Sequence, residues 1–148
     1  MRNRSFLPLA SAPKCHVTTF KRKCVNGFAH RKIKGYATKN ALKLVTFGQP
    51  RTGDQTFADA HDSQFSYSYR VTHKRDLVPH VPFRSMEGYV HHKYEVWYNN
   101  GMTSGAPFKE CSLDDSDHCS DGQIDWSIED HLHYFGVMVS AFGEGGCV

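Results

Sequence analysis

The chain has 148 residues, a length that suits one compact domain with a usable core. No apolar run in it approaches the roughly 18 residues that a membrane-spanning helix needs, so composition favours a protein that is soluble or peripheral to a membrane. The net charge of +3 hides an asymmetry: residues 1–53 hold 12 basic and no acidic side chains, whereas residues 54–148 hold 6 basic and 15 acidic ones. Such a contrast usually marks a tail or a junction.

The basic N-terminal segment, residues 1–40, is expected to be weakly ordered. Its charge is unbalanced and no uninterrupted helical period runs through it. Two basic runs, KRKC at residues 21–24 and RKIK at residues 31–34, have a charge that suits nucleic acid or anionic lipid. Because no nucleic-acid-binding motif accompanies them, we interpret them as a solvated tail and expect no nucleic-acid partner.

Regular structure is first indicated at residues 42–47, an apolar run rich in β-forming residues that Gly48 and Pro50 bound. A short helix is predicted over residues 54–60. Residues 67–72 alternate polar and apolar side chains and are typical of a second strand, which we expect to run parallel to the first.

The second half of the chain begins with a polar loop closed by Pro79 and Pro82, which we expect to stop regular structure because proline lacks a donor and restricts the residue before it. Residues 94–98, YEVWY, alternate as a strand, and residues 99–107 form a turn with two glycines. The last periodic stretch covers residues 128–138.

Two residues in this pattern carry candidate chemistry. Asp76 follows the second predicted strand, and His131 comes much later, near the start of the last periodic stretch. A carboxylate at a strand's end can accept the proton of an imidazole Nδ1, fix the tautomer and stabilise the imidazolium. An acid followed by a distant histidine is the Asp-then-His half of the Ser, Asp, His order of α/β-hydrolases.

Spacing alone leaves a simpler interpretation open for both residues. Asp76 could be a solvated loop acid paired with Lys74 or Arg75. His131 could be a locally capped histidine at the start of a helix.

Four ordered sequence blocks favour the catalytic interpretation. They are TFGQPRTG at residues 46–53, YRVTHKRDLVPHVP at residues 69–82, GYVHHKYEVWY at residues 88–98 and DHLHYFG at residues 130–136. Together they resemble the class 3, or fungal-type, lipases in the form common in animals and especially nematodes. The resemblance covers roughly residues 41–148.

This resemblance implies a partial α/β-hydrolase fold, the C-terminal portion of a mainly parallel sheet with flanking helices. The triad acid of the family aligns with Asp76 and its histidine with His131, and the resemblance suggests that His73 and His80 brace the acid loop by hydrogen bonds. It also implies a lipid or ester substrate met at a lipid–water interface. The oligomeric state stays open.

The nucleophile of such an enzyme is not found in the 148 residues. The family's serine occupies a Gly-x-Ser-x-Gly elbow, whose small residues permit a strained strand-to-helix turn. No serine here qualifies: Ser104 comes nearest, but Met102 and Ala106 stand where the glycines should be. We therefore interpret residues 41–148 as the C-terminal part of a lipase domain, joined to an altered N-terminus by truncation, alternative splicing or an imperfect gene model.

Two functions follow from these observations. The chain is expected to be a lipase-like protein of lipid metabolism that resembles a triacylglycerol or carboxylic ester hydrolase but lacks the nucleophile elbow. The alternative is a non-catalytic remnant or a module that binds lipid or protein.

Five cysteines favour an oxidising compartment, with reduced thiols in a cytosolic protein as the alternative. Cys111 and Cys119 flank the acidic loop SLDDSDH, where the resembling lipases carry a small disulfide loop, so the resemblance implies a bridge between them. Cys147 matches a terminal cysteine that in the family commonly pairs with one near the N-terminus of the domain; here it is left free or must pair with Cys15 or Cys24.

The resemblance implies a secreted or extracellular protein, although residues 1–12 make an unconvincing signal peptide. Their apolar run is short and contains Pro8, and the acid-poor start equally permits a mitochondrial presequence.

No cofactor or metal is expected. The scattered cysteines and histidines lack the tight pairs of structural zinc sites. That set is His91, His92, Cys111, His118, Cys119 and His133.

Overall fold

The computed structural model of the chain describes residues 39–86 and 88–147. Except for residues 39 and 40, the basic segment expected over residues 1–40 lies outside the described residues, as do the targeting signals weighed over residues 1–12. The described elements, in chain order, are η1 (Lys39–Ala41), β1 (Leu44–Phe47), α2 (Gln55–Gln64), β2 (Ser68–His73), η2 (Val78–His80), β3 (Glu95–Tyr98), β4 (Lys109–Cys111), η3 (Ser120–Gly122), α3 (Ile128–Leu132), β5 (His133–Tyr134), β6 (Val137–Met138) and α4 (Val139–Glu144).

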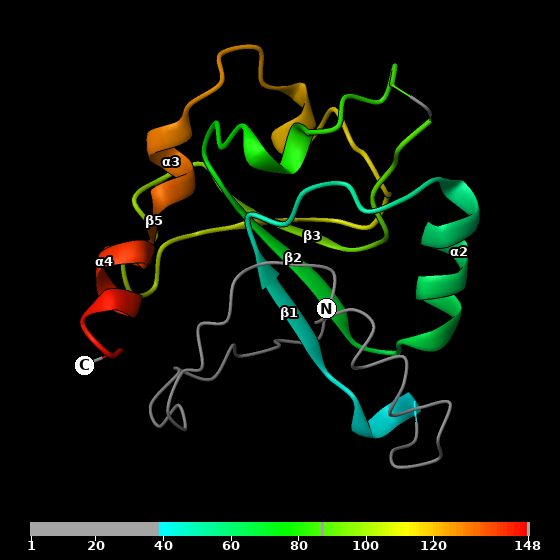
Figure 1. Cartoon of the computed structure of the whole chain (residues 1–148), viewed down its shortest axis with the longest axis horizontal. Helices are drawn as coiled ribbons and strands as arrows, with labels where there is room; N and C mark the ends of the chain where they lie inside the picture. The colour runs from blue at the N-terminus through cyan, green and yellow to red at the C-terminus, as the bar shows by residue number, and fades with distance from the viewer. Residues whose placement is uncertain (1–38, 87, 148) are drawn as a thin grey trace.

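A four-stranded sheet in the order β1-β2-β3-β4 occupies the centre of the described part (Figure 1). β1 pairs with β2 and β2 with β3 in parallel, and this register sets Phe47 opposite Val71 and Val71 opposite Val96. The three expected strands and the parallel pairing are confirmed, with ends shifted by one or two residues. β4, which pairs antiparallel with β3, was not predicted, because its three residues KEC show no apolar alternation.

Helix α2 makes the crossover between the two parallel strands β1 and β2. Asp54 caps its start by accepting a hydrogen bond from the Phe57 backbone N–H at 2.9 Å, as N-terminal caps generally do. Ala58 and His61, three residues apart, are buried on one helix face. The helix continues to Gln64, four residues beyond its predicted end. In Figure 1 it lies to the right of the sheet, with α3, β5 and α4 to the left.

Two small clusters make up the apolar core of the described residues. One joins Val71 of β2 and Val96 of β3 to Met102 and Tyr134. The other packs Trp97 against the Cys111–Cys119 disulfide, whose Cα atoms are 6.3 Å apart. The predicted bridge is therefore confirmed, and it anchors the acidic loop to the far strand of the sheet.

The expectation of one periodic stretch over residues 128–138 is wrong. Helix α3 ends at Leu132. β5 and β6 then form a hairpin, with two residues in each strand and two in the turn, before α4 begins. Phe135 and Gly136 occupy the turn with φ values of +52° and +77°, as a type I′ hairpin turn requires. The positive φ values at Phe135 and Gly136 reverse the chain into a hairpin, so the helix does not continue to residue 138.

The loop around Pro79 also departs from expectation. Pro79 lies inside the short 3-10 helix η2 instead of stopping regular structure, because its fixed φ suits the first positions of a helical turn. Among the residues that the structure describes, no helix combines the length and apolarity needed to cross a bilayer.

Candidate active site

Asp76 and His131 lie side by side at the carboxyl end of the parallel strands. His131 Nδ1 is 3.0 Å from Asp76 Oδ2, although the two residues come from different elements, the loop after β2 and helix α3. A carboxylate oxygen can only accept, so this contact is made when Nδ1 carries the proton. Nε2 then holds the lone pair, and 31% of the His131 side chain is exposed.

The Asp76 carboxylate is enclosed by donors. Only 1% of the residue is exposed. Besides His131, the Tyr134 hydroxyl donates to Oδ2 at 2.8 Å and the Val78 backbone N–H donates to Oδ1 at 2.9 Å. These hydrogen bonds compensate the desolvation of a buried carboxylate. In turn, burial and then the adjacent Asp76 carboxylate raise the pKa of Tyr134 far above its usual value, so its hydroxyl stays a donor.

Backbone pairing sets the distance between acid and histidine. Asp76 forms an isolated parallel bridge with Ser127, in which Ser127 N–H donates to Arg75 O at 2.7 Å and Leu77 N–H donates to Ser127 O at 3.2 Å. The Ser127 hydroxyl caps helix α3 by accepting from Asp130 N–H at 3.1 Å. Because His131 directly follows Asp130, the helix start and the acid loop are fixed to each other.

Gly48 forms one wall of the pair. Its φ is +56°, and a Cβ at this position would lie 2.7 Å from His131 Nδ1 and 2.9 Å from Asp76 Oδ2. Real Cβ contacts are essentially never that short, so the first residue after β1 must be glycine for the two side chains to meet here.

The simpler pairing considered for Asp76 is not the one found. Lys74 and Arg75 face Asp130 instead, with Lys74 Nζ 3.9 Å from Asp130 Oδ1 and Arg75 Nε 4.0 Å from Oδ2. Both ring nitrogens of His73 lie within hydrogen-bonding distance of a backbone carbonyl, Nδ1 3.0 Å from Asp130 O and Nε2 2.9 Å from Asn100 O. His73 thereby connects the end of β2 to helix α3.

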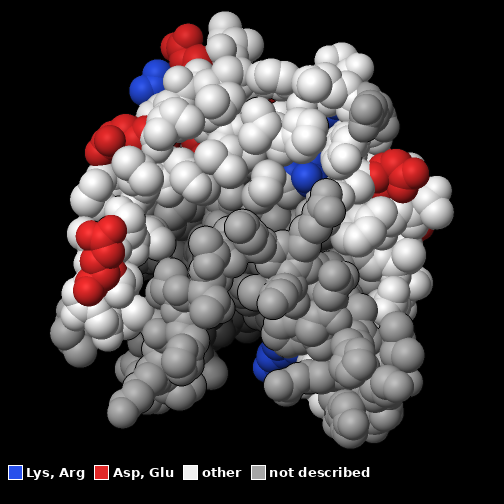
Figure 2. Space-filling model, in the orientation of Figure 1, with Lys and Arg blue, Asp and Glu red and all other residues white. Residues whose placement is uncertain are grey.

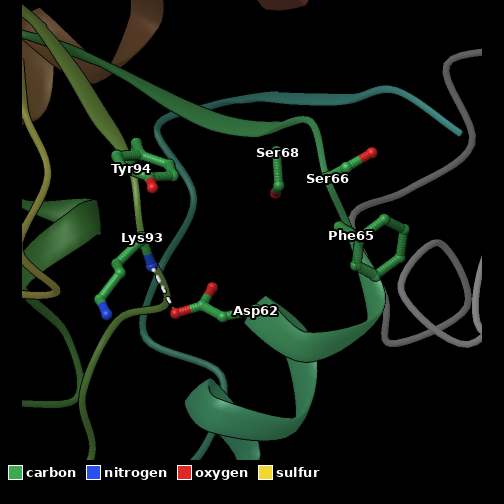
Figure 3. Close-up of a pocket in the computed structure, with 6 residues that line it drawn as sticks. All are labelled: Asp62, Phe65, Ser66, Ser68, Lys93 and Tyr94. Carbon is green, nitrogen blue, oxygen red and sulfur yellow. Dashed lines mark hydrogen bonds between the residues drawn. The ribbon is translucent and has the colours of Figure 1, made fainter. Parts of the chain in front are cut away.

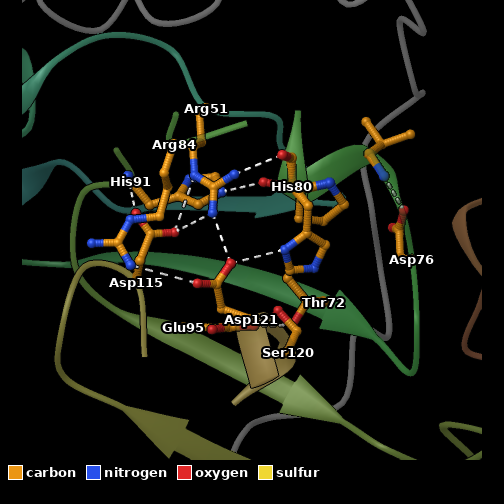
Figure 4. Close-up of polar contacts among 12 residues, drawn as sticks. Arg51, Thr72, Asp76, His80, Arg84, His91, Glu95, Asp115, Ser120 and Asp121 are labelled. Carbon is orange, nitrogen blue, oxygen red and sulfur yellow. Dashed lines mark hydrogen bonds and ion pairs between the residues drawn. The ribbon is translucent and has the colours of Figure 1, made fainter. Parts of the chain in front are cut away.

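A second polar cluster supports the loop that follows Asp76 (Figure 4). The Arg51 guanidinium donates to Asp115 Oδ1 at 2.8 Å and to Asp121 Oδ1 at 2.7 Å, and it also donates to the carbonyls of His80 and Pro82. Arg51 is 4% exposed, so these are buried, charge-assisted bonds. They attach the disulfide-closed acidic loop to the proline-rich loop.

His80 belongs to the same cluster. Its Nδ1 lies 3.1 Å from Asp121 Oδ1, and its ring stacks on Trp126 with centroids 4.0 Å apart. The hydrogen bond from His80 lowers the pKa of Asp121. Burial opposes this effect, but the charge of Arg51 adds to it, so the pKa lies below its usual value. Below this group, Glu95 accepts from the hydroxyls of Thr72 and Ser120.

The remaining histidines and cysteines of the predicted set are dispersed. His91 Nε2 donates to Pro79 O at 2.7 Å, and burial lowers the pKa of His91 well below its usual value. His133 pairs with Glu129 on the surface at 3.2 Å. The pairing weighed for Cys147 involves Cys15 and Cys24, which lie outside the described residues.

On the face that Figure 2 shows, the described residues do not gather basic side chains into a patch. On the part of the face in Figure 2 that the described residues occupy, the basic side chains are few and stand apart, while acidic ones appear at several places around the rim.

Sequence reasoning missed Tyr134 and Gly48. Both lie in sequence blocks that had been recognised, and Tyr134 follows His131 at a helix-like spacing of three residues. A buried tyrosine, however, is hard to distinguish from an ordinary core aromatic, and a glycine after a strand from an ordinary turn.

Chemically, this arrangement can orient one imidazole and stabilise its protonated form. Within the described residues, the hydrogen bond to Asp76 is the one that the His131 side chain makes. With Nδ1 bonded to Asp76, Nε2 is the ring atom that can take a proton from a group that approaches the site.

Comparison with known proteins places these residues in a wider context. A family model described as lipase (class 3) matches residues 27–86. Lipase ZK262.3 of Caenorhabditis elegans is 36% identical over 143 residues, covering 76% of this chain and 40% of the relative. Secreted mono- and diacylglycerol lipase 1 of Fusarium solani is 34% identical over 101 residues, covering 66% of this chain and 30% of the relative.

The fold agrees with these matches. The crystal structure of a lipase from Rhizopus microsporus var. chinensis superposes with a TM-score of 0.69 at 32% identity, and the match covers 84% of this chain and 41% of that one. The chain thus spans about two-fifths of the length of the nematode relative and of the solved structure. Its mostly parallel sheet with flanking helices is the expected partial α/β-hydrolase fold. The chain belongs to the class 3 lipase family.

Proposed function

We propose that the chain is a lipase-like protein of lipid metabolism in which Asp76 and His131 are the acid and the base of a carboxylic ester hydrolase centre. The observation that carries the proposal is the 3.0 Å contact between His131 Nδ1 and Asp76 Oδ2, made by two residues 55 positions apart. An ordinary capping histidine on the surface would not be expected to pair with a buried carboxylate. Asp76 is 1% exposed and accepts two further hydrogen bonds, which favours a catalytic pair.

In this centre each side chain has a distinct task. His131 Nε2 takes the proton of a serine hydroxyl as the serine attacks the ester carbonyl, and later returns it to the leaving alcohol. Asp76 holds the imidazole in the required tautomer and stabilises the imidazolium. The serine and the oxyanion donor that follows it belong to a Gly-x-Ser-x-Gly elbow, which the 148 residues do not contain.

The proposed substrates are triacylglycerols or other carboxylic esters at a lipid–water interface. Family membership and the names of the relatives support this class. The Cys111–Cys119 disulfide supports a secreted or other oxidising location, because such bridges persist mainly outside the cytosol.

Activity assays test the role assigned to the chain. We expect the purified 148-residue protein to show no specific turnover of p-nitrophenyl or glyceride esters, since His131 has no positioned alcohol to activate. A fluorophosphonate probe should label none of its serines. Hydrolysis that disappears in His131→Ala, with the probe mapped to one serine of the chain, would reveal a relocated nucleophile and overturn the interpretation of an inactive half-site.

A second measurement separates the half-site from a non-catalytic binding module. In a poised centre the Nδ1 proton of His131 should give a far-downfield NMR resonance that Asp76→Asn removes. A His131 ring that exchanges freely between tautomers in the wild-type chain would favour the binding-module alternative. A transcript that encodes a Gly-His-Ser-Leu-Gly-like elbow in frame upstream of Ala41 would identify the enzyme to which the half-site belongs.

A further inference from the structure

Another cluster of chemically active side chains lies at the opposite end of the parallel strands from Asp76. Asp76 follows the carboxyl end of β2, whereas this cluster is beside the amino ends of β2 and β3. It consists of His61 and Asp62 on α2 and His92 on the segment that enters β3. One ligand atom from each of the three residues lies within 4.8 Å of the others. The catalytic proposal uses none of them.

The contacts of the His92 ring place its proton on Nδ1 and its lone pair on Nε2. Its Nδ1 lies 2.6 Å from Lys93 O, and because a carbonyl only accepts, Nδ1 must carry the proton. Nε2 is then the acceptor, and the Gln49 amide nitrogen meets it at 3.1 Å. A backbone carbonyl that fixes the tautomer in this way is the usual outer-shell partner of a histidine that ligates a metal.

His61 is the least satisfied polar side chain of the group. It is 4% exposed, and its Nε2 has no hydrogen-bond partner among the described residues. Its Nδ1 is 3.4 Å from Asp62 Oδ1, which is long for a hydrogen bond. The ring stacks against His92 with centroids 3.7 Å apart and against Phe65 at 4.7 Å. Burial lowers the pKa of both histidines, that of His92 to about 3, which favours the neutral form that can ligate a metal.

We propose that His61, Asp62 and His92 bind one divalent transition-metal ion, with zinc as the preferred ion. Two imidazoles and one carboxylate are a donor set that zinc takes, with water in the remaining position. Metal–ligand bonds of about 2.0–2.1 Å at a tetrahedral angle put two ligand atoms roughly 3.3 Å apart. The His61 Nδ1 to Asp62 Oδ1 distance of 3.4 Å already has this value, so Nδ1 is the ligand atom of His61 and Nε2 carries the ring proton.

Closing the site requires His92 to move, because ligand atoms that now lie within 4.8 Å of one another must come to roughly 3.3 Å. Its ring must tilt away from the stacked position so that Nε2 turns from Gln49 toward the ion. The Asp62 carboxylate lies partly open to solvent, with 24% of its side chain exposed. It lines a cavity of about 280 Å³ together with Phe65, Ser66, Ser68, Lys93 and Tyr94 (Figure 3). This cavity gives an entering ion access to the Asp62 carboxylate.

Nearby charge limits the affinity. Arg70, which is 2% exposed, donates from Nε to His92 O at 2.9 Å and opposes a second cation. The single carboxylate of Asp62 offsets only part of the ion's charge. Binding in the micromolar range is therefore expected, and its structural effect is to tie helix α2 to the entrance of β3.

This site could not be anticipated from spacing. His61 and His92 stand 31 residues apart and share no motif, and His61 was not in the set of cysteines and histidines weighed for a metal. The crossover between β1 and β2 is what brings helix α2 against the entrance of β3.

Metal titration of the whole oxidised chain tests the proposal. After removal of metals with a chelator, isothermal titration calorimetry with Zn²⁺ should show one equivalent bound. Asp62→Asn should weaken binding at least tenfold, since losing even an outer-shell partner costs roughly that much. The matched control is Asp59→Asn, an exposed acid on the same helix that bonds to Gln55, and it should bind as the wild type does.

Cobalt spectroscopy identifies the ligands. The Co²⁺ complex should show visible bands of nitrogen and oxygen ligands without a thiolate charge-transfer band, and His92→Gln should abolish them. The same spectrum should persist when Cys15, Cys24 and Cys147 are replaced by serine. Near-UV circular dichroism of the metal-free variants verifies their folding.

Three results would overturn the proposal: no binding in the micromolar range, equal weakening by Asp59→Asn and Asp62→Asn, or dependence on the three cysteines.

Discussion

Tyr134 and His131 share one oxygen of Asp76: the tyrosine hydroxyl is 2.8 Å and the imidazole Nδ1 3.0 Å from the same Oδ2. The other oxygen accepts from the Val78 backbone. These contacts hold the carboxylate in one rotamer, and the carboxylate in turn fixes the orientation of the His131 ring. Tyr134 is accordingly a positioning residue, which acts on His131 through Asp76.

Removing the Tyr134 hydroxyl should weaken the fold and loosen the pair. Tyr134→Phe keeps the ring in the core but leaves Oδ2 one donor short, and hydrogen bonds to charged groups contribute about 1.5–3 kcal/mol. Urea unfolding should report a loss of this size. Tyr94→Phe is the control, because Tyr94 is 40% exposed. Equal stability of Tyr134→Phe and wild type would mean that the hydroxyl contact contributes nothing.

Alkaline pH should also act through Tyr134. Burial raises its pKa above the ordinary value of 10.0, so the folded chain keeps a proton that the unfolded chain releases. The resulting stability is fully present below pH 10 and is lost as pH rises above it, by up to about 1.4 kcal/mol per pH unit. The loss should be shallower in Tyr134→Phe. Tyr98, whose pKa burial also raises, should leave a residual slope in both chains. Parallel alkaline unfolding curves would contradict this assignment.

Gly48→Ala should displace His131 from Asp76. The new Cβ would fall 2.7 Å from the imidazole, in addition to the cost of a φ of +56°. Gly105→Ala is a matched control, since Gly105 has a φ of +78° but open space around it. Both variants should lose about 1–2 kcal/mol from backbone strain. Gly48→Ala alone should lose more and shift the His131 ring resonances. If both variants lose the same stability and the His131 resonances do not change, the contact of a Cβ at position 48 with the His131 ring is relieved by a shift of the backbone, and the prediction is wrong.

Much of the sheet could be predicted because its strands are marked locally. The apolar run before Gly48 and the alternation around Val71 each indicate a strand and its end, and the parallel order follows from the helix between them. The hairpin at Phe135 was missed because its turn uses a non-glycine residue at positive φ. Tertiary packing of Phe135 against Phe47 and Tyr98 favours that conformation, and a local pattern cannot display it.

The candidate site divides in the same way. Asp76 and His131 were recognised through sequence blocks, whereas their separation depends on the pairing of Asp76 with Ser127. That pairing is one isolated bridge between segments far apart in the chain. No periodicity in the sequence indicates it, so the distance between acid and histidine becomes known only in the folded chain.

The disulfide provides the last prediction. Cys111 and Cys119, eight positions apart, close a loop over Trp97, and that loop carries Asp115, one of the carboxylates that bind Arg51. Loop-closure entropy for such a length is worth about 2–3 kcal/mol. Replacing both cysteines by alanine should lower the free energy of unfolding by that amount and change the fluorescence of Trp97.

A control and a second perturbation separate the bridge from the side chains that form it. Cys147→Ser should leave the Trp97 fluorescence unchanged, because position 147 lies outside the loop, whereas mild reduction of the wild type should reproduce the double variant. Arg51→Lys should destabilise the bridge-free chain less than it destabilises the wild type, since the contact of Arg51 with Asp115 depends on the closed loop. Alkylation and mass spectrometry of secreted protein provide the direct check. Two alkylated thiols at positions 111 and 119 in folded, secreted material would refute the bridge and with it the role of the loop as a brace for Arg51.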